Sequence, residues 1–358
     1  MNGPGGPAER SDRAAAPTVA LDGFGAEQGF DVLAEGARRA AADGISVRVF
    51  GPPDGLALDG ADGVELIPTC ERIGNEDDAV AAVRSRPDAS IVRAAADVAA
   101  GPADALATVG STGAAMAAAT FGLRRLHGVQ RPALAVRVPA PGAPVLFLDV
   151  GANVGVRAQH LVQFAFLGAA FSAAVLGVAD PRVGLLSVGE EAGKGTDEVI
   201  AAGERLASSV GIDYVGNVEG RDIPAGAADV VVTDGFTGNV ALKLMEGTVK
   251  VVTGAIRDAA RSNPVAAVGG LMMRPALGGL RRELDPDTTG GAILLGLRGI
   301  AVVGHGSSGP DGIANAVRLA ARAAEADAVG RTAALLERAG ATRRALADSS
   351  PRDRKDAR

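Results

Sequence analysis

The chain has 358 residues, of which 47% are hydrophobic, and a formal net charge of −6. This length and composition suit a globular protein with one large or two ordinary domains. The negative charge argues against a general nucleic-acid-binding surface. A chain with no Trp and one Tyr also lacks the aromatic residues that stack on single-stranded bases. The single Cys70 excludes an internal disulfide framework and fits a reducing compartment.

The first 17 residues are rich in Gly, Pro and Ala and lack the apolar core of a signal peptide. No uninterrupted apolar run approaches the roughly 18 residues that span a bilayer. We therefore expect a cytoplasmic protein.

Short apolar strands alternate with helical segments along the chain. Strands are expected at residues 18–21, 47–50, 64–67, 105–109, 134–138, 145–148, 183–188, 213–215, 230–232 and 300–303. Helices are expected at residues 30–42, 87–99, 114–126, 160–176, 198–209, 239–261, 310–328 and 332–347. Strands 134–138 and 145–148 are expected to form a hairpin. The alternation predicts an α/β fold with a parallel sheet covered by helices on both faces.

Four strands run into a glycine-rich polar turn and then into a helix. The turns are Gly110-Ser111-Thr112-Gly113, Asp149-Val150-Gly151-Ala152-Asn153, Asp234-Gly235-Phe236-Thr237-Gly238-Asn239 and Gly304-His305-Gly306-Ser307-Ser308. Each turn aims the positive end of a helix, with free backbone N–H groups, at the carboxyl edge of the sheet. Right-handed crossovers would place these turns on one edge, where they would form an anion site, and phosphate is the commonest anion at such sites.

Lysines are scarce, since only Lys194, Lys243, Lys250 and Lys355 occur among 36 basic residues. Lys194 and Lys243 lie in glycine-flanked polar motifs. Either these positions require a compact ammonium group, or the two lysines are solvated surface residues that remain there by chance. We assign Lys243, Asn239 and Gly238 to phosphate binding. Lys194 is a candidate for contact with phosphate or with an oxyanion.

Other polar residues in these motifs are candidate substrate or phosphate contacts. Ser111 and Thr112 can donate hydroxyl hydrogen bonds, and Asn153 an amide one. Asp149 and Asp234 end their strands and either cap the following turns or act as bases. Arg221 either binds an anion or pairs with Glu219 or Asp222.

His305 follows a strand in a polar turn, which is the right place for a site residue. It either protonates a leaving thiolate or positions another group. His160 opens a long helix and is a weaker site candidate, and His127 is expected at the surface of a helix end. One Cys and dispersed His residues give no zinc-ligand spacing, so we expect neither a metal nor a cofactor.

Seven motifs resemble, in the same order, the phosphate acyltransferase family of bacterial phospholipid synthesis. They are Leu148-Asp149-Val150-Gly151-Ala152-Asn153-Val154, Gly216-Asn217-Val218-Glu219-Gly220-Arg221-Asp222, the run from Asp234 to Lys243, Arg131-Pro132-Ala133-Leu134-Ala135, Gly189-Glu190-Glu191-Ala192-Gly193-Lys194-Gly195, Gly290-Gly291-Ala292-Ile293-Leu294-Leu295-Gly296 and His305-Gly306-Ser307-Ser308. Because Asn217 and Arg221 lie in one of them, both join the candidate substrate contacts.

The resemblance implies a three-layer, doubly wound, mostly parallel α/β fold like that of the isocitrate/isopropylmalate dehydrogenases and phosphotransacetylases. It also implies a homodimer. The implied reaction transfers a fatty acyl group from an acyl carrier protein thioester to inorganic phosphate. The acyl phosphate would then pass to a membrane glycerol-3-phosphate acyltransferase.

Two other functions stay open. The family's N-terminal motif is altered here to Asp22-Gly23-Phe24-Gly25-Ala26-Glu27, and Ser111 replaces an amide residue. These changes favour a non-catalytic paralogue that binds carrier protein or phosphate, whereas the intact motifs at Asp149–Asn153, Asn217–Asp222 and Asp234–Lys243 favour the acyltransferase more strongly. The third possibility is a phosphate acyltransferase that uses acyl-coenzyme A.

The expected organisation is one catalytic domain at residues 17–347 between disordered tails at 1–16 and 348–358. A helical segment at about 254–284 is expected to protrude from this domain. Within it, residues 265–280 combine Leu271, Met272 and Met273 with neighbouring arginines. This pattern suits peripheral attachment to anionic lipid, although packing on the core, on a second copy or on an acidic carrier is the alternative.

Overall fold

The computed structural model describes residues 16–56, 58, 60–283 and 286–348, and one eleven-stranded sheet runs through this part of the chain. Except for residues 16 and 348, the two expected tails lie outside the described residues. The strands are β1 (Thr18–Asp22), β2 (Ser46–Gly51), β3 (Val64–Pro68), β4 (Ala105–Thr108), β5 (Ala133–Val138), β6 (Val145–Leu148), β7 (Arg182–Leu186), β8 (Asp213–Val218), β9 (Val230–Val232), β10 (Ala292–Leu295) and β11 (Ile300–Val303). Their order across the sheet is β3-β2-β1-β4-β11-β10-β5-β6-β9-β7-β8.

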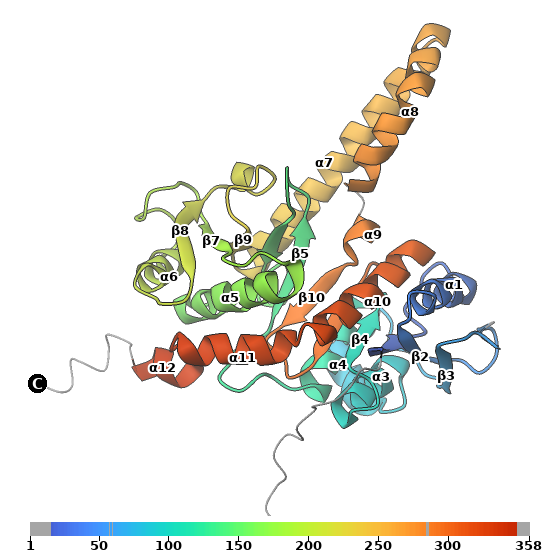
Figure 1. Ribbon diagram of the computed structural model, residues 1–358, viewed down its shortest axis with the longest axis horizontal. Coiled ribbons are helices and arrows are strands. Elements are labelled where there is room, and N and C mark those ends of the chain that lie inside the picture. The colour runs from blue at the N-terminus through green and yellow to red at the C-terminus, as the bar shows by residue number, and fades with distance from the viewer. Residues whose placement is uncertain (1–15, 57, 59, 284–285, 349–358) are drawn as a thin grey trace, which may run out of the picture.

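Helices cover both faces of the sheet (Figure 1). One face carries α1 (Phe30–Ala41), α5 (Ala158–Phe171) with its π-helical extension (Ser172–Leu176), α6 (Asp197–Ala207), α10 (Pro310–Glu325) and α11 (Ala328–Arg338). The other face carries α2 (Ala79–Ser85), α3 (Ser90–Ala100), α4 (Thr112–Gly122) and α7 (Gly235–Arg261). The remaining helices are α8 (Pro264–Glu283), α9 (Pro286–Thr289), α12 (Arg343–Asp348) and a 3-10 turn (Gly220–Asp222).

The core forms because successive strand residues point to opposite faces. In β6, Leu146 and Leu148 join the core under α5, whereas Val145 and Phe147 join the core under α4 and α7. A sheet buried on both faces reads as a continuous apolar run, which is why the strands were visible in the sequence. The expected three-layer, mostly parallel α/β fold is confirmed.

The sheet nevertheless consists of two parallel halves that run in opposite directions. Strands β1, β2, β3, β4 and β11 are mutually parallel, and so are β6, β7, β8 and β9. Between the halves lie three successive antiparallel pairs, β11 with β10, β10 with β5, and β5 with β6. Because three is an odd number of reversals, the strands of the two halves end at opposite edges.

The expectation that all four glycine-rich turns meet on one edge is therefore wrong. The turns after β4 and β11 lie at one edge, and the turns after β6 and β9 lie at the other. The strand that the sequence did not predict is β10, because its four apolar residues are too few to show a clear hydrophobic periodicity. It enters the sheet through Gly291, whose φ is 88° and where an added Cβ would lie 2.5 Å from the Val303 carbonyl oxygen. Only glycine fits so close to the end of β11.

Other differences are local. The expected hairpin of β5 and β6 is present. Helix α7 begins at Gly235 rather than after Gly238 because the Asp234 side chain caps it. The last expected helix, residues 332–347, is divided into α11 and α12. Residues 264–283 form one helix that contains Pro275.

Within the described residues, one helix is long and apolar enough to cross a membrane by length and composition, Ala158–Leu176. His160 and Gln163 interrupt its apolar run, so the sequence pattern did not single it out. About 72% of its apolar window is buried in the protein, mainly under α6 and α11, as is typical of a core helix.

Helices α7 and α8 form an antiparallel hairpin that extends from the body of the molecule (Figure 1). The link between them is short, and the Asn263 side chain accepts a hydrogen bond from the Ala266 N–H at 2.9 Å. The base of α7 is anchored on the sheet, where Gly238 lies against the Asp149 carbonyl oxygen.

This close approach makes a prediction about two glycines of the same helix. A Cβ at Gly238 would lie 1.9 Å from the Asp149 oxygen, whereas nothing lies within 4 Å of a Cβ at Gly247. Gly238→Ala should lower the free energy of unfolding by about 1–3 kcal/mol or prevent folding. The control Gly247→Ala should raise it by ~0.5–1 kcal/mol, since alanine favours helix. Urea denaturation measures both, and equal stability of the two variants would contradict the packing.

Candidate active site

The turn after β6 is filled by its own carboxylate. Asp149 is fully buried and accepts backbone N–H bonds from Gly151 (3.2 Å), Ala152 (3.0 Å) and Asn153 (2.7 Å). The Asn153 amide donates to the same carboxylate at 2.8 Å. Burial raises the pKa of Asp149, while the hydrogen bonds from this turn act against the rise. Asp149 therefore caps its turn, as one of the two sequence readings held.

The turn after β9 is filled in the same way. One oxygen of Asp234 accepts from the N–H groups of Phe236 and Thr237, each at 2.9 Å, and the other accepts from the Thr237 hydroxyl. The N–H of Gly238 donates within the helix to the Asp234 carbonyl. Asp234 is thus a helix cap, and Gly238 has a packing role that its motif did not reveal. Asn239 stays exposed on the first turn of α7.

A third carboxylate occupies the start of α10 and comes from a distant helix. Asp287 of α9 accepts from the Ser308 hydroxyl at 2.6 Å and from the Gly309 N–H at 3.2 Å. The sequence gave no sign of this contact, because the two segments are 21 residues apart and belong to different elements.

The turn after β4, which leads directly into α4, differs from the other three turns; the Asp149 turn itself ends five residues before α5 begins at Ala158. Among the described residues, no carboxylate reaches the start of α4, and the N–H groups of Thr112 and Gly113 have no hydrogen-bond partner. The Ser111 hydroxyl accepts only a long bond, 3.4 Å, from the Ala114 N–H. Thr112 is exposed. The positive end of α4, an eleven-residue helix, is therefore open to an anion.

A group of three charged residues lies at the same sheet edge. Lys243 pairs with Glu246 at 2.9 Å, and the other oxygen of Glu246 lies 3.6 Å from His305 Nε2. His305 follows β11, the neighbour of β4, and Gly304 donates its N–H to the Thr108 carbonyl. The hydrogen bond from His305 contributes most to lowering the pKa of Glu246 to about 2, and Lys243 adds to it, so this carboxylate is ionised at neutral pH. Glu246 was not anticipated, although its place three residues after Lys243 fits a helical pair.

Three further candidates lie together at the far end of the sheet. The Asn217 amide donates to the carbonyls of Glu191 (2.9 Å) and Lys194 (3.2 Å) and so ties the loop after β7 to β8. Arg221 pairs with Glu219 at 2.9 Å and lies 3.6 Å from Glu190. Arg221 therefore forms the ion pair with Glu219 that was one of its two predicted roles. The Lys194 side chain is exposed.

The sequence-predicted residues thus fall into three groups. Ser111, Thr112, Lys243 and His305 share the edge formed by the ends of β4 and β11. Asn153, Asp234, Gly238 and Asn239 belong to the opposite edge. Lys194, Asn217 and Arg221 follow the last two strands. Within the described residues, no cluster of His, Cys, Asp and Glu is arranged to hold a metal.

His160 is a structural residue rather than part of any of these groups. Its Nδ1 accepts the Arg157 N–H at 3.0 Å, and its Nε2 lies 3.2 Å from the Gln130 amide oxygen. Burial, together with Arg131 and Arg157, lowers its pKa to about 4.

Comparison with solved structures identifies the class of fold. A phosphotransacetylase from Streptococcus pyogenes matches with a TM-score of 0.56 over 87% of this chain and 94% of its own, at 17% identity. The EutD phosphotransacetylase from Staphylococcus aureus matches with a TM-score of 0.55 over 86% and 94%, also at 17% identity. The chain therefore has the phosphotransacetylase fold.

Sequence comparison identifies the family. A family model described as fatty acid synthesis protein matches residues 18–331. The phosphate acyltransferases of Elusimicrobium minutum and Thermobifida fusca are each 42% identical, over 85% and 86% of this chain and 91% and 88% of their own. The chain belongs to this family of phosphate acyltransferases, as its motifs indicated, and it is an acyltransferase.

The lowered pKa of His160 makes a prediction about acid stability. Below pH 6.5 the unfolded imidazole takes up a proton that the folded one accepts only near pH 4, so stability is complete above pH 6.5 and falls toward pH 4. When the pH falls from 7 to 4.5, this histidine should lower the free energy of unfolding by on the order of 2–3 kcal/mol. Urea unfolding of the wild type and of His160→Gln at several pH values measures it. A pH dependence that is identical in the two proteins would contradict the assignment.

Proposed function

We propose that the protein transfers a fatty acyl group from an acyl carrier protein thioester to inorganic phosphate. The products are an acyl phosphate and the free thiol of the carrier. The acyl phosphate then serves a membrane glycerol-3-phosphate acyltransferase in the synthesis of phosphatidic acid and phospholipids. The family membership supports the phosphate acceptor, and the carrier and the pathway rest on the motif resemblance.

The observation that carries the proposal is the open start of α4. Of the four turns that the sequence marked, it alone has no capping carboxylate within the described chain, and the N–H groups of Thr112 and Gly113 there lack a hydrogen-bond partner. A phosphate there would receive hydrogen bonds from Thr112 and Gly113 and from the hydroxyls of Ser111 and Thr112. Lys243 supplies an ammonium group and His305 an imidazole at the same edge of the sheet.

The chemistry needs no covalent enzyme intermediate. Phosphate is an anionic nucleophile at neutral pH, so the site has to hold it against the thioester and stabilise the developing oxyanion. A phosphate oxygen attacks the carbonyl carbon, the C–O bond forms, and the C–S bond breaks. The electron pair leaves on sulfur, and the thiolate takes a proton from His305 or from water. Glu246 pairs with Lys243 and lies beside His305, so it holds both side chains in place.

Two alternatives remain attached to this proposal. Coenzyme A would replace the carrier protein if the site recognises only the thioester arm. A non-catalytic paralogue would keep the anion site without turnover. The combination of an open helix start with the Lys243–Glu246–His305 group favours catalysis, because binding alone would not need a proton donor beside the anion.

The deciding experiment follows acyl phosphate directly. Purified protein, long-chain acyl carrier protein and phosphate should give an acyl phosphate that hydroxylamine traps as a hydroxamate. Removing one ammonium contact should weaken phosphate binding by about 1.5–3 kcal/mol, so Lys243→Ala should raise the KM for phosphate roughly tenfold or more. Lys250→Ala, an exposed lysine two turns further along α7, is the matched control and should leave it unchanged.

The results separate the candidates. Activity with acyl-coenzyme A but not with acyl carrier protein would show that coenzyme A is the acyl donor. If neither thioester is lost in a phosphate-dependent way, the protein is a non-catalytic paralogue. A folded Lys243→Ala variant with wild-type kinetics would remove Lys243 from the site.

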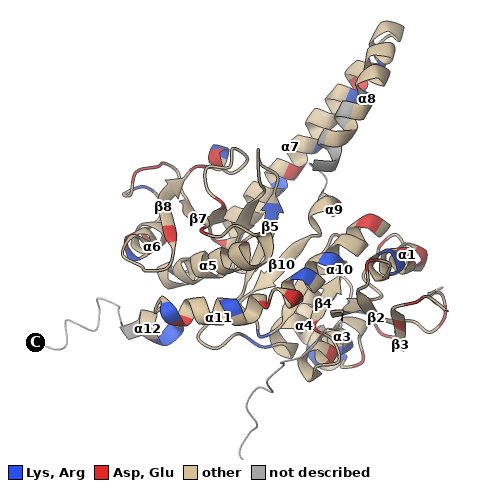
Figure 2. Cartoon of the chain, viewed as in Figure 1, with Lys and Arg blue, Asp and Glu red and all other residues tan. Residues whose placement is uncertain are grey.

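We further propose that the α7–α8 hairpin attaches the protein to the membrane surface and contributes to a homodimer. The exposed fractions of Leu271 and Met272 on α8 are 67% and 79%, with Arg274 beside them. Figure 2 shows charged and uncharged stretches along the hairpin. On α7, Phe236, Val240 and Leu244 form an exposed apolar stripe at intervals of four residues, which suits a helix of a second copy. The side chains of Leu277, Leu280, Arg281 and Arg282 lie outside the described residues.

The membrane part has its own test. Wild-type protein should float with anionic vesicles, and Leu271→Glu combined with Met272→Glu should release it while soluble activity persists. Val188→Glu with Val210→Glu changes two equally exposed valines outside the hairpin and should not release it. A wild-type protein that never floats contradicts the attachment, and a variant that becomes monomeric assigns these residues to the dimer.

A further inference from the structure

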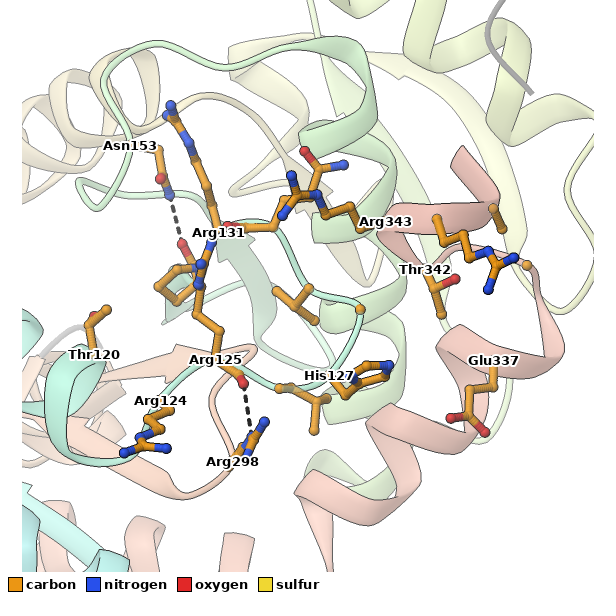
Figure 3. Close-up of a pocket in the computed structure, with 18 of the residues that line it drawn as sticks. Thr120, Arg124, Arg125, His127, Arg131, Asn153, Arg298, Glu337, Thr342 and Arg343 are labelled. Carbon is orange, nitrogen blue, oxygen red and sulfur yellow. Dashed lines mark hydrogen bonds between the residues drawn. The ribbon is translucent and has the colours of Figure 1, made fainter. Parts of the chain in front are cut away.

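A groove of about 1340 Å³ opens beside the C-terminal end of α4, at the sheet edge opposite Lys243 and His305 (Figure 3). Six arginines line it, and Glu337 is the one acidic residue in its lining. The arginines are Arg124, Arg125, Arg131, Arg298, Arg343 and Arg344. We call this surface the arginine groove.

The arginines gather there from four separate parts of the chain. They come from the loop after α4, the segment before β5, the turn between β10 and β11, and the start of α12. All six are exposed, and none forms an ion pair with a carboxylate among the described residues. The side chains of Arg125, Arg131 and Arg298 donate to backbone carbonyls, and the six guanidinium groups together attract an anion to this surface.

The backbone holds part of this surface in a costly conformation. Arg124 has a φ of 60°, in the left-handed region where glycine or asparagine is the usual residue. The Arg298 N–H donates to the Arg124 carbonyl at 3.0 Å, and Arg125 forms an antiparallel bridge with Leu297. The Arg298 side chain donates to the Arg125 carbonyl at 3.2 Å. These contacts fix three arginines side by side, and strain of this kind is typical of a binding surface.

Helix α4 connects the groove to the candidate phosphate site. Thr120 lines the groove, and Thr112 begins the helix at the open anion position. At 1.5 Å per residue the helix is ~16 Å long. A donor docked in the groove would therefore need a long arm to bring its thioester to the far end of α4.

We propose that the arginine groove is the docking surface for an acidic carrier protein that brings the acyl group, an inference that rests on the proposed acyl transfer. The groove is larger than the roughly 300–1,000 Å³ of ordinary small-molecule sites. Its charges are spread and exposed, as suits the acidic face of a protein rather than one compact anion. The chain as a whole carries −6, so an acidic partner is repelled elsewhere and directed to this surface.

The test uses the full chain and an acyl carrier protein loaded with a long-chain acyl group. The double variant Arg343→Glu, Arg344→Glu should weaken binding at low salt at least tenfold and reduce the salt dependence of Kd. The ratio of kcat/KM for the acyl carrier protein to that for a small uncharged acyl thioester should fall by a similar factor. The control Arg331→Glu, Arg338→Glu changes the same charge on exposed residues of α11 outside the groove and should change Kd less than twofold.

An unchanged Kd in the groove variant overturns the docking surface, and so does each of the next three results. An equal loss with the small thioester means general damage to the enzyme. An equal loss with acyl-coenzyme A means that the groove recognises phosphate groups rather than a protein face. Displacement of the carrier by trace RNA assigns the groove to nucleic acid. If no thioester is turned over, the proposed function fails, whereas the binding measurement still decides whether the carrier docks here.

Discussion

Three successive antiparallel pairs at the centre of the sheet reverse its direction, and the positions of the functional groups depend on this reversal. A sheet that was parallel throughout would gather every glycine-rich turn on one edge. Here the turns after β4 and β11 form one edge, and those after β6 and β9 form the other. Helix α7 starts at the second edge and carries Lys243 and Glu246 to the first, where His305 lies. The helix thereby joins the two halves of the fold.

Internal carboxylates decide which helix start can hold a substrate anion. The carboxylates of Asp149, Asp234 and Asp287 each accept one or more hydrogen bonds from the backbone N–H groups of a turn, as a bound phosphate would. Such capping fixes the geometry of a turn at the expense of its capacity to bind anions. The start of α4 has only a weak hydroxyl cap, so one anion position is left open beside the charged group around Glu246.

Charge is distributed unevenly in this acidic protein. Several arginines outside the groove pair with carboxylates, as Arg86 does with Asp77 and Arg182 with Asp229. The arginine groove lacks such partners among the described residues, and at the other sheet edge Lys243 and His305 share one glutamate, Glu246. The two cationic surfaces lie at opposite edges and at the two ends of α4, an arrangement that suits a donor held at one place and reacting at another.

The sequence by itself determined the class of fold, most strands and helices, and the family, and it predicted Lys243 and His305 as site residues. Apolar runs, turn glycines and motif order are local signals, so they can be recognised in the sequence without knowing which distant segments come into contact. Only the tertiary structure decided the direction of β10, the role of Glu246, the capping by Asp287 and the meeting of six arginines. These depend on pairing and contact between distant segments, and no residue of a four-residue apolar run such as Ala292–Leu295 specifies which neighbour it will pair with or in which direction.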